Sequence, residues 1–302
     1  MNNSIANKVF MVRPANFSYN EQTAITNPLM RSEKYKNVRS IAKMEFDNVV
    51  KVLRDNGIYV YVWNDTDEPK TPDAVFPNNW FCTLEDGTLV LFPMFAKNRR
   101  LERDSDAIQL IKRLCATNCV IDFSEWENKQ HFLEGTGSMV LDRENKIAYA
   151  CRSLRTSETV LNEFCKKAGF KPIMFSAVDY NGMPMYHTNV VMSIGSDFAV
   201  VCNKAFKDAQ EWHIVSKSLT KCGKRIINIT PEQMFNYAGN IIELKNLKGE
   251  SVVLMSETAH NSFTEEQLSD ILSGDKKLAV VSIPTIEKVG GGSARCMVAE
   301  LF

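Results

Sequence analysis

The stretch GGGSARCMVAELF, residues 290–302, closes the chain with three glycines, an arginine and a cysteine before a short apolar run. Consecutive glycines permit backbone conformations that other residues avoid, and residues 297–301 have the pattern of a short strand. Chain ends are usually poorly ordered, so a strand here needs a partner segment. KVFMVRPANF, residues 8–17, has a matching strand pattern. We therefore expect the two ends of the chain to pair within one structural unit.

Four further segments share a two-strand layout in which a polar or glycine-containing start leads into a strand, a turn and a second apolar strand. They are PNNWFCTLEDGTLVLFPM (77–94), EGTGSMVLDRENKIAYAC (134–151), HTNVVMSIGSDFAVVC (187–202) and AGNIIELKNLKGESVVLM (238–255). Their turns are of the kind that connects hairpin strands. Equivalent positions near the start of each unit are spaced by 58, 52, 51 and 55 residues, the five positions being Asn79, Gly137, Asn189, Asn240 and Arg295. Near-constant spacing of this size is typical of a repeat architecture.

Each hairpin is followed by a helix pattern and another strand. Residues 36–56 carry apolar residues at helical spacing and end before Gly57, and IYVYVW (58–63) follows as a strand. Later helices are predicted to begin at Thr230–Pro231 and at Thr264, the second ending near Gly274. The sequence therefore predicts an α/β fold of five ββαβ units that close head to tail into a ring. We expect residues 1–302 to form one catalytic domain.

The composition restricts the classes of partner. Lysine plus arginine and aspartate plus glutamate both number 36, so there is no electrostatic case for nucleic acid or an anionic membrane, and a small amino-acid ligand fits better. Residues 1–12 lack the pattern of a secretory signal, and no apolar run reaches about 18 residues, so we expect a cytoplasmic protein. The eight cysteines form no C-x-x-C pair, which predicts free thiols and no metal site. The sequence does not decide the oligomeric state, and a homo-oligomer is one of the states it allows.

Three residues could carry covalent chemistry. Cys296 follows the glycine run beside Arg295, and cationic or N–H-rich surroundings stabilise a thiolate, although a single cysteine is more often a packed thiol. A nucleophilic cysteine needs an acid–base partner, and His187 occupies the equivalent position at the start of the third hairpin. Glu134 begins the second hairpin, where an acid could orient an imidazole, but an exposed loop carboxylate fits the spacing as well.

In order along the chain, four motifs resemble those of the arginine deiminase/amidinotransferase superfamily of guanidino-modifying enzymes, the penteins. They are FPNN (76–79), LEG (133–135), HTN (187–189) and GGGSARCM (290–297). The resemblance covers essentially the whole chain and implies a five-bladed α/β propeller. It also implies Cys296 as nucleophile, His187 as general acid–base and Glu134 as its partner, without a metal or organic cofactor. Within the superfamily, four stretches look most like those of citrulline-utilisation-type hydrolases. They are RPANFSYNEQTAITN (13–27), PNNWF (77–81), FPM with NRRLER (92–103) and AGNIIEL (238–244).

The resemblance assigns Phe76, Asn79 and Asn189 to substrate binding, but with a departure. Arginine and dimethylarginine enzymes of the superfamily have aspartates where this chain has Asn79 and Asn189. A guanidinium is a cation with only donors, whereas a ureido group is neutral with one acceptor, which an amide can match. The substrate carboxylate needs a cationic partner, for which Arg13 and the cluster Arg99, Arg100 and Arg103 are candidates.

The sequence therefore favours hydrolysis of a ureido amino acid, citrulline to ornithine, ammonia and carbon dioxide. Two alternatives remain open. An arginine or methylarginine deiminase, dimethylaminohydrolase or amidinotransferase of the same superfamily would keep the same cysteine, histidine and glutamate. A non-catalytic propeller that only binds a ligand would not require the three together.

Overall fold

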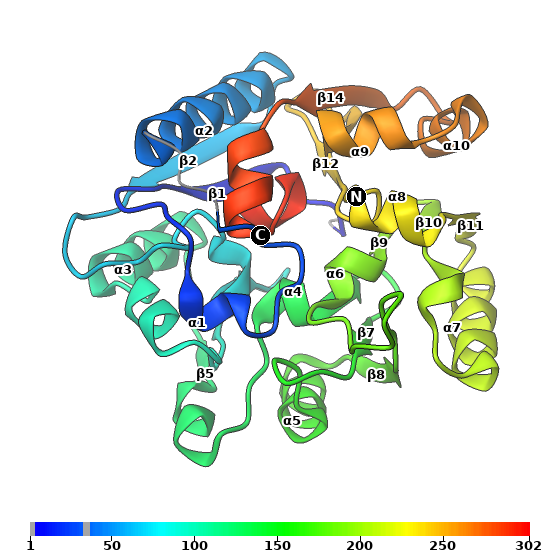
Figure 1. The fold of residues 1–302 in the computed structure, drawn as a ribbon, viewed down its shortest axis with the longest axis horizontal. Helices are drawn as coiled ribbons and strands as arrows, with labels where there is room; N and C mark the ends of the chain where they lie inside the picture. Colours follow the sequence, from blue (N-terminus) through cyan, green and yellow to red (C-terminus); the bar gives the residue numbers. More distant parts are fainter. Residues whose placement is uncertain (1–3, 33–36) are drawn as a thin grey trace.

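The computed structural model describes residues 4–32 and 37–302, and its strands form five three-stranded sheets arranged around a common axis (Figure 1). In each sheet the middle strand pairs antiparallel with one neighbour and parallel with the other. An antiparallel pair needs only a short turn, whereas a parallel pair needs a crossover, which a helix supplies in every unit. The predicted ring of five ββαβ units is confirmed.

The first sheet joins the two ends of the chain. Its order is β15 (Ala299–Leu301), β1 (Lys8–Arg13) and β2 (Tyr59–Asn64). Lys8 pairs with Leu301 and Phe10 with Ala299 in an antiparallel register, while β1 and β2 run parallel. The prediction that the terminal strands share one unit is confirmed. This pairing fixes the chain just after Cys296, so the segment that carries the cysteine is held inside the ring.

The other four sheets follow in sequence order. They are β3 (Phe81–Thr83), β4 (Leu89–Leu91) and β5 (Val120–Asp122); β6 (Met139–Asp142), β7 (Ile147–Cys151) and β8 (Lys171–Phe175); β9 (Met192–Ile194), β10 (Phe198–Val201) and β11 (Arg225–Asn228); and β12 (Ile242–Lys245), β13 (Ser251–Ser256) and β14 (Lys277–Val281).

The crossover helices form the rim of the ring, and shorter helices lie nearer its axis (Figure 1). On the rim are α2 (Val38–Asp55), α3 (Ser105–Leu114), α5 (Glu158–Ala168), α7 (Ala209–Lys221), α9 (Glu257–Ser262) and α10 (Glu265–Ile271). Nearer the axis are α1 (Glu21–Ala24), α4 (Gly135–Ser138), α6 (Thr188–Val191) and α8 (Pro231–Phe235). Two of the inner helices, α4 and α6, lead directly into β6 and β9 and include residues of the LEG and HTN motifs.

Helix boundaries follow the sequence signals closely. The stripe predicted over residues 36–56 is α2, which begins at Val38, and residue 36 lies outside the described residues. Both α8 and α10 begin with a capping box, in which Thr230 and Thr264 each accept a bond from a backbone N–H three residues later. The second helix ends at Ile271 rather than at Gly274, since Leu272 already leaves the regular helix.

Hydrophobic side chains fill the spaces between neighbouring sheets. One buried cluster joins Phe10 and Leu301 of the first sheet to Phe81 and Leu89 of the next, and the rings of Phe10 and Phe81 meet edge to face at 5.6 Å between centroids. The other clusters also draw on at least two adjacent sheets. Burial between sheets holds the units at fixed angles and brings the starts of the hairpins together. Over residues 4–32 and 37–302, no helix is long and apolar enough to cross a membrane.

Candidate active site

The segments that start the hairpins meet at the axis of the ring. The 3-10 helix Pro77–Asn79 contacts α4 and the 3-10 helix Ala294–Met297, and α4 in turn contacts α6. Equivalent positions of a closed repeat converge on the axis, as the spacing of the sequence repeat predicts. Residues far apart in the chain therefore form one site.

The glycine run lets the backbone before Cys296 pack closely against the rings of Phe76 and Phe17. A Cβ added at Gly290 or Gly292 would lie 2.9 Å from the ring of Phe76, and Gly291 has a φ of +64°. Ser293 Oγ donates to Glu287 Oε1 at 2.6 Å, which ties the end of the run to the preceding turn. These contacts leave no room for larger residues, so the three glycines place Cys296, which is 5% exposed, at the edge of a cavity.

Two side-chain amides surround the sulfur. Asn189 Nδ2 lies 3.4 Å from Cys296 Sγ, and Asn240 Nδ2 lies 3.2 Å from it. Asn240 belongs to the turn after α8 and was singled out in the sequence only as a repeat position. That repeat position, equivalent to Asn189 and Arg295, is the signal by which its place at the axis could have been found.

His187 and Glu134 form a buried pair. His187 Nε2 lies 2.8 Å from Glu134 Oε2, and Phe95 N donates to Glu134 Oε1 at 3.0 Å. Arg155 Nη1 approaches Glu134 Oε2 at 3.4 Å. Burial by itself raises the pKa of Glu134, but Arg155 and His187 outweigh burial and hold that pKa below its usual range. Burial lowers the pKa of His187 to about 4, although Glu134 opposes the change.

This pattern defines the state of the imidazole. Because an ionised carboxylate only accepts hydrogen bonds, His187 Nε2 carries the proton and Nδ1 is the basic nitrogen. Gly137 packs against that edge of the ring, since a Cβ there would lie 2.8 Å from His187 Nδ1 and 2.5 Å from Asn79 Nδ2. A neutral imidazole held in one tautomer can accept a proton from a thiol.

A cavity of about 270 Å³ links the predicted residues. Cys296, His187, Phe76 and Asn79 line it. Glu134 lies behind His187, and Asn189 reaches the sulfur without lining this cavity. The structure thus brings the predicted catalytic residues and the three residues of the FPNN and HTN motifs assigned to substrate binding close together.

Arg13, a candidate partner of the substrate carboxylate, lies elsewhere. Its Nε and Nη2 each donate to a carboxylate oxygen of Asp47 at 2.7 Å, at a partly exposed position between β1 and α2. Its guanidinium is therefore engaged outside the cavity, and the assignment of Arg13 to the substrate carboxylate is not supported. In the other candidate cluster, only Arg99 lines the cavity, while Arg100 and Arg103 bind Glu127.

Two charged residues of the cavity were missed in the sequence. Arg155 lines it with 1% exposure and binds Thr26 Oγ1 at 2.8 Å and Thr23 O at 2.6 Å. Asp73 lines it with 2% exposure, and its Oδ2 accepts bonds from Asn20 Nδ2 at 2.7 Å and Thr23 Oγ1 at 2.6 Å. Asp73 Oδ1 is buried and has no hydrogen-bond partner in the described part of the chain. Its place three residues before the FPNN motif was the available signal.

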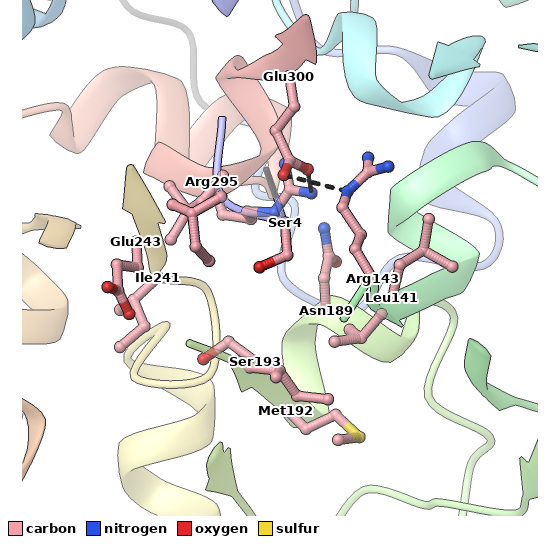
Figure 2. Close-up of a pocket in the computed structure, with 14 residues that line it drawn as sticks. Ser4, Leu141, Arg143, Asn189, Met192, Ser193, Ile241, Glu243, Arg295 and Glu300 are labelled. Carbon is pink, nitrogen blue, oxygen red and sulfur yellow. Dashed lines mark hydrogen bonds and ion pairs between the residues drawn. The ribbon is translucent and has the colours of Figure 1, made fainter. Parts of the chain in front are cut away.

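Arg295 does not serve the sulfur as the sequence suggested. Figure 2 shows its side chain in a second cavity, of about 500 Å³, which Asn189, Arg143 and Glu300 also line. Arg295 Nη2 lies 3.0 Å from Glu300 Oε2, and Arg143 Nε lies 3.4 Å from Glu300 Oε1. Successive residues of a 3-10 helix point about 120° apart, so neighbours in sequence can face different cavities.

A metal site was not expected, and no group of three or more histidine, cysteine, aspartate or glutamate side chains in residues 4–32 and 37–302 is arranged to hold a metal ion. The possible ligand atoms at the site are one thiol, one imidazole and the carboxylates of Glu134, which Arg155 contacts, and Asp73, whose Oδ1 has no partner in the described part of the chain. A thiol, a neutral imidazole and buried charges thus lie together at one cavity.

Comparison with protein families gives one match over nearly the whole chain. The model of the family described as "N,N dimethylarginine dimethylhydrolase, eukaryotic" matches residues 13–302. No curated protein matches the chain.

Solved structures share the fold. ArgZ, an arginine dihydrolase from the ornithine-ammonia cycle in cyanobacteria, is 16% identical with a TM-score of 0.75, over 97% of this chain and 40% of ArgZ. Unliganded AgrE is 19% identical with a TM-score of 0.76, over 98% of this chain and 39% of AgrE. A dimethylarginine dimethylaminohydrolase variant in an adduct with S-methyl-L-thiocitrulline is 13% identical with a TM-score of 0.65, over 98% and 100%. The chain thus spans about two fifths of ArgZ and AgrE, and these likenesses show the fold alone.

Proposed function

The chain belongs to the family described as "N,N dimethylarginine dimethylhydrolase, eukaryotic", within the pentein superfamily, and from that membership we propose that it hydrolyses a C–N bond in the guanidino group of an amino acid. The substrate class is arginine or an N-methylated arginine, and the products are a ureido amino acid and ammonia or a methylamine. We also infer that the five units act as one catalytic domain, because the site draws on every part of the ring.

Asp73 is the observation that carries the proposal. Its Oδ1 is a buried carboxylate oxygen without a hydrogen-bond partner in the described residues, in the cavity that holds Cys296 and His187. An unpaired buried carboxylate oxygen is costly, and a guanidinium offers it both N–H donors and a positive charge. A ureido group would offer the donors without the charge. A cationic substrate therefore suits this position better than a neutral one.

The other charges of the cavity are already paired. Arg99 binds both oxygens of Glu102, at 2.8 and 2.9 Å, and Arg155 lies beside Glu134. Arg99 Nε is 3.8 Å from Asp73 Oδ2, so it offsets part of the Asp73 charge, while Oδ1 has no hydrogen-bond partner in the described residues. The negative charge that remains for a ligand is that of Asp73.

The proposed reaction uses Cys296 and His187 in two steps. His187 Nδ1 takes the thiol proton, and Cys296 Sγ attacks the guanidino carbon while the imidazolium gives its proton to the departing nitrogen. An amidino group is then bound to sulfur. Water attacks the same carbon, His187 accepts its proton, and the carbon–sulfur bond breaks to release the ureido product and restore the thiol. Glu134 stabilises the imidazolium and holds its orientation.

A Cys→Ser variant of the N-terminal domain of ArgZ has been solved bound to substrate, and a Cys→Ala variant of AgrE with L-arginine. These relatives give independent support to a cysteine nucleophile and an arginine-like substrate in this chain.

We assign the substrate carboxylate to Arg155. It is a buried arginine on the cavity wall, and its Nη1 makes only the 3.4 Å contact with Glu134. The corresponding atom of Arg99 is held more tightly, since Arg99 Nη1 donates to Asn79 Oδ1 at 2.7 Å. An arginine whose Nη1 has only one long contact is the better partner for a second carboxylate.

Hydrolysis of citrulline to ornithine, ammonia and carbon dioxide is the second candidate. It is favoured by the amides Asn79 and Asn189, which replace the carboxylates of the arginine-type motifs. However, Asn79 Oδ1 already accepts a 2.7 Å bond from Arg99 Nη1, and Asn189 Nδ2 contacts the sulfur, so the acceptor of Asn79 and the donor of Asn189 are both in use.

Substrate profiling distinguishes the two candidates. The protein is incubated with arginine, N,N-dimethylarginine and citrulline, and ammonia, dimethylamine, citrulline and ornithine are measured. We expect citrulline as product from one or both guanidino compounds. Release of ornithine from citrulline with no turnover of either guanidino compound would replace the proposal by the second candidate.

A further inference from the structure

We propose that Asn189 and Asn240 form an amide pair that stabilises the negatively charged form of Cys296 Sγ, so that both act on the nucleophile rather than on the substrate. The inference deepens the proposed function and rests on it for the role of Cys296. It assigns a catalytic part to Asn240 and a different part to Asn189 from the substrate contact that its motif suggests.

The first observation is the direction of the hydrogen bonds. Both side chains are 1% exposed, and both present Nδ2 to the sulfur, at 3.4 Å from Asn189 and 3.2 Å from Asn240. A sulfur that accepts two N–H bonds is favoured in its charged form, because hydrogen bonds to the charged form of a group stabilise that form.

The orientation of Asn240 is fixed independently of the sulfur. Its Nδ2 also donates to the backbone carbonyl of Asn189 at 3.0 Å, so its two hydrogens serve that carbonyl and Sγ. A flipped amide would place two oxygens against each other. Gly239 makes this approach possible, since a Cβ there would lie 2.3 Å from Val190 O.

The second observation concerns the hydrogen bonding of the two amide oxygens. Oδ1 of Asn189 and Oδ1 of Asn240 are both buried without a hydrogen-bond partner in residues 4–32 and 37–302. Buried polar atoms are nearly always paired, and an oxygen turned toward a neutral thiol could accept its S–H. Both residues instead direct their donors at the sulfur. This arrangement suits a charged sulfur and costs stability when the thiol is neutral.

The amide is also the right group for electrostatic reasons. A carboxylate at either position would place a second negative charge beside the sulfur and disfavour its ionisation. Asparagine has the shape of aspartate but supplies a donor. The departure from the aspartate motif at Asn189 then has a reason that does not involve the substrate.

Other charged and titratable groups lie near Cys296 on neighbouring elements, whether or not their side chains point at the sulfur. Tyr186 and His187 precede α6, Tyr237 follows α8, and Arg295 adjoins the cysteine, while Asp73, Arg99 and Arg155 lie across the cavity. Substitution of Asn240 leaves all of them in place, so a change in sulfur reactivity in such a variant reports on the amide.

The test measures alkylation of Cys296 by iodoacetamide, which forms an S–C bond to the charged sulfur with loss of iodide, as a function of pH. Mass spectrometry of the peptide that contains Cys296 separates it from the other seven cysteines. The variants are Asn240→Asp, Asn240→Ala and Asn240→Ser. Asn16→Asp is the matched control, because buried Asn16 also donates twice through Nδ2, to Thr66 O at 3.0 Å and Asp67 O at 2.8 Å.

We expect Asn240→Asp to lower the alkylation rate at neutral pH about tenfold or more and to raise the midpoint of the pH profile by about one unit, because tenfold corresponds to one unit. Asn240→Ala and Asn240→Ser should fall between it and wild type, and Asn16→Asp should match wild type. With a guanidino substrate, kcat should fall far more than KM changes. If the aspartate variant does not fold, the alanine and serine variants decide by the same midpoint.

A wild-type profile in folded Asn240 variants, or an equal shift in Asn16→Asp, overturns the inference. The alkylation assay contains no substrate, so it is independent of the proposed function. A shifted profile in a protein that hydrolyses no guanidino compound would refute the proposed function and leave the amide pair standing. Turnover of arginine together with unshifted alkylation profiles would refute the amide pair and leave the proposed function standing.

Discussion

His187 Nε2 lies 2.8 Å from Glu134 Oε2, and both side chains are almost completely buried. The carboxylate is paired with Arg155 as well, so one buried charge orients the base and is itself compensated. A buried pair of this kind is expensive to break from one side, because the partner left behind keeps its desolvation cost. The contact has consequences for both catalysis and stability.

The Glu134→Gln variant should lose most of its activity while keeping the fold. Removing the carboxylate removes the group that stabilises the imidazolium, and general acid–base contributions of this kind are about 10²- to 10⁴-fold. We expect kcat with the best guanidino substrate to fall by about 100-fold. The measurement is kcat with circular dichroism as the control for folding. A folded variant with more than a third of wild-type kcat would contradict the role given to Glu134.

Stability should decrease in mildly acidic solution because of His187. Burial lowers its pKa from 6.5 to about 4, so between these values the unfolded chain binds a proton that the folded chain does not. Its share of the free energy of unfolding is therefore complete above pH about 6.5 and is lost as pH falls toward 4. The shift corresponds to roughly 3 kcal/mol.

Denaturant unfolding at several pH values checks this prediction in wild type and in His187→Gln. The glutamine variant should lack most of the slope between pH about 6.5 and 4, whereas substitution of exposed His213 should leave it unchanged. Equal slopes in wild type and His187→Gln would mean that His187 titrates normally in the folded protein.

The Cys296→Ser variant should be folded and inactive. A hydroxyl at this site is a far weaker nucleophile, and removal of a covalent nucleophile costs several orders of magnitude in rate. Cys151→Ser is the matched control, since Cys151 is buried in β7 and does not line the cavity. More than a tenth of wild-type turnover in Cys296→Ser would exclude a covalent cysteine mechanism.

The Asp73→Asn variant should lose guanidino activity without losing stability. Charge-assisted hydrogen bonds contribute about 1.5–3 kcal/mol, so kcat/KM for arginine or dimethylarginine should fall about 10- to 100-fold. The amide keeps an oxygen for Asn20 and Thr23, and it no longer buries an unpaired negative oxygen, so the melting temperature should stay level or rise. Asp47→Asn serves as a surface control. A melting temperature that falls sharply, with unchanged kcat/KM in the remaining folded protein, would show that Asp73 is a structural residue.

The fold could be predicted from the sequence because its signals are local and repeated. Hairpin turns, capping residues and the spacing of the repeats each lie within one unit, and the closing strand pair follows from the ring. The convergence of Cys296 and His187 follows from equivalent positions in that ring. Sequence pattern alone was sufficient for these features.

The details of the site depend on contacts between units. The sequence could not show that Arg13 is bound to Asp47, because Asp47 lies on the crossover helix that folds back beside β1. Arg295 follows the glycine run, but the 3-10 helix turns its side chain toward Glu300. Asp73 reaches the cavity through the loop before the first hairpin, outside the repeated pattern. Side-chain direction, unlike repeat position, cannot be read from spacing.

Whether Arg155 or Arg13 binds the substrate carboxylate can be tested by comparing two substrates. Agmatine has the guanidino group of arginine but no carboxylate, so wild type should strongly prefer arginine. In Arg155→Gln, kcat/KM for arginine should fall about 10- to 100-fold more than kcat/KM for agmatine, because only arginine loses a charge-assisted contact. Arg155 also adjoins Glu134, so both substrates should lose some turnover, and the ratio of the two values is the decisive quantity. Arg13→Gln should leave that ratio unchanged, since Arg13 is bound to Asp47 outside the cavity. If the ratio changes in Arg13→Gln and not in Arg155→Gln, the substrate carboxylate is bound by Arg13 and not by Arg155.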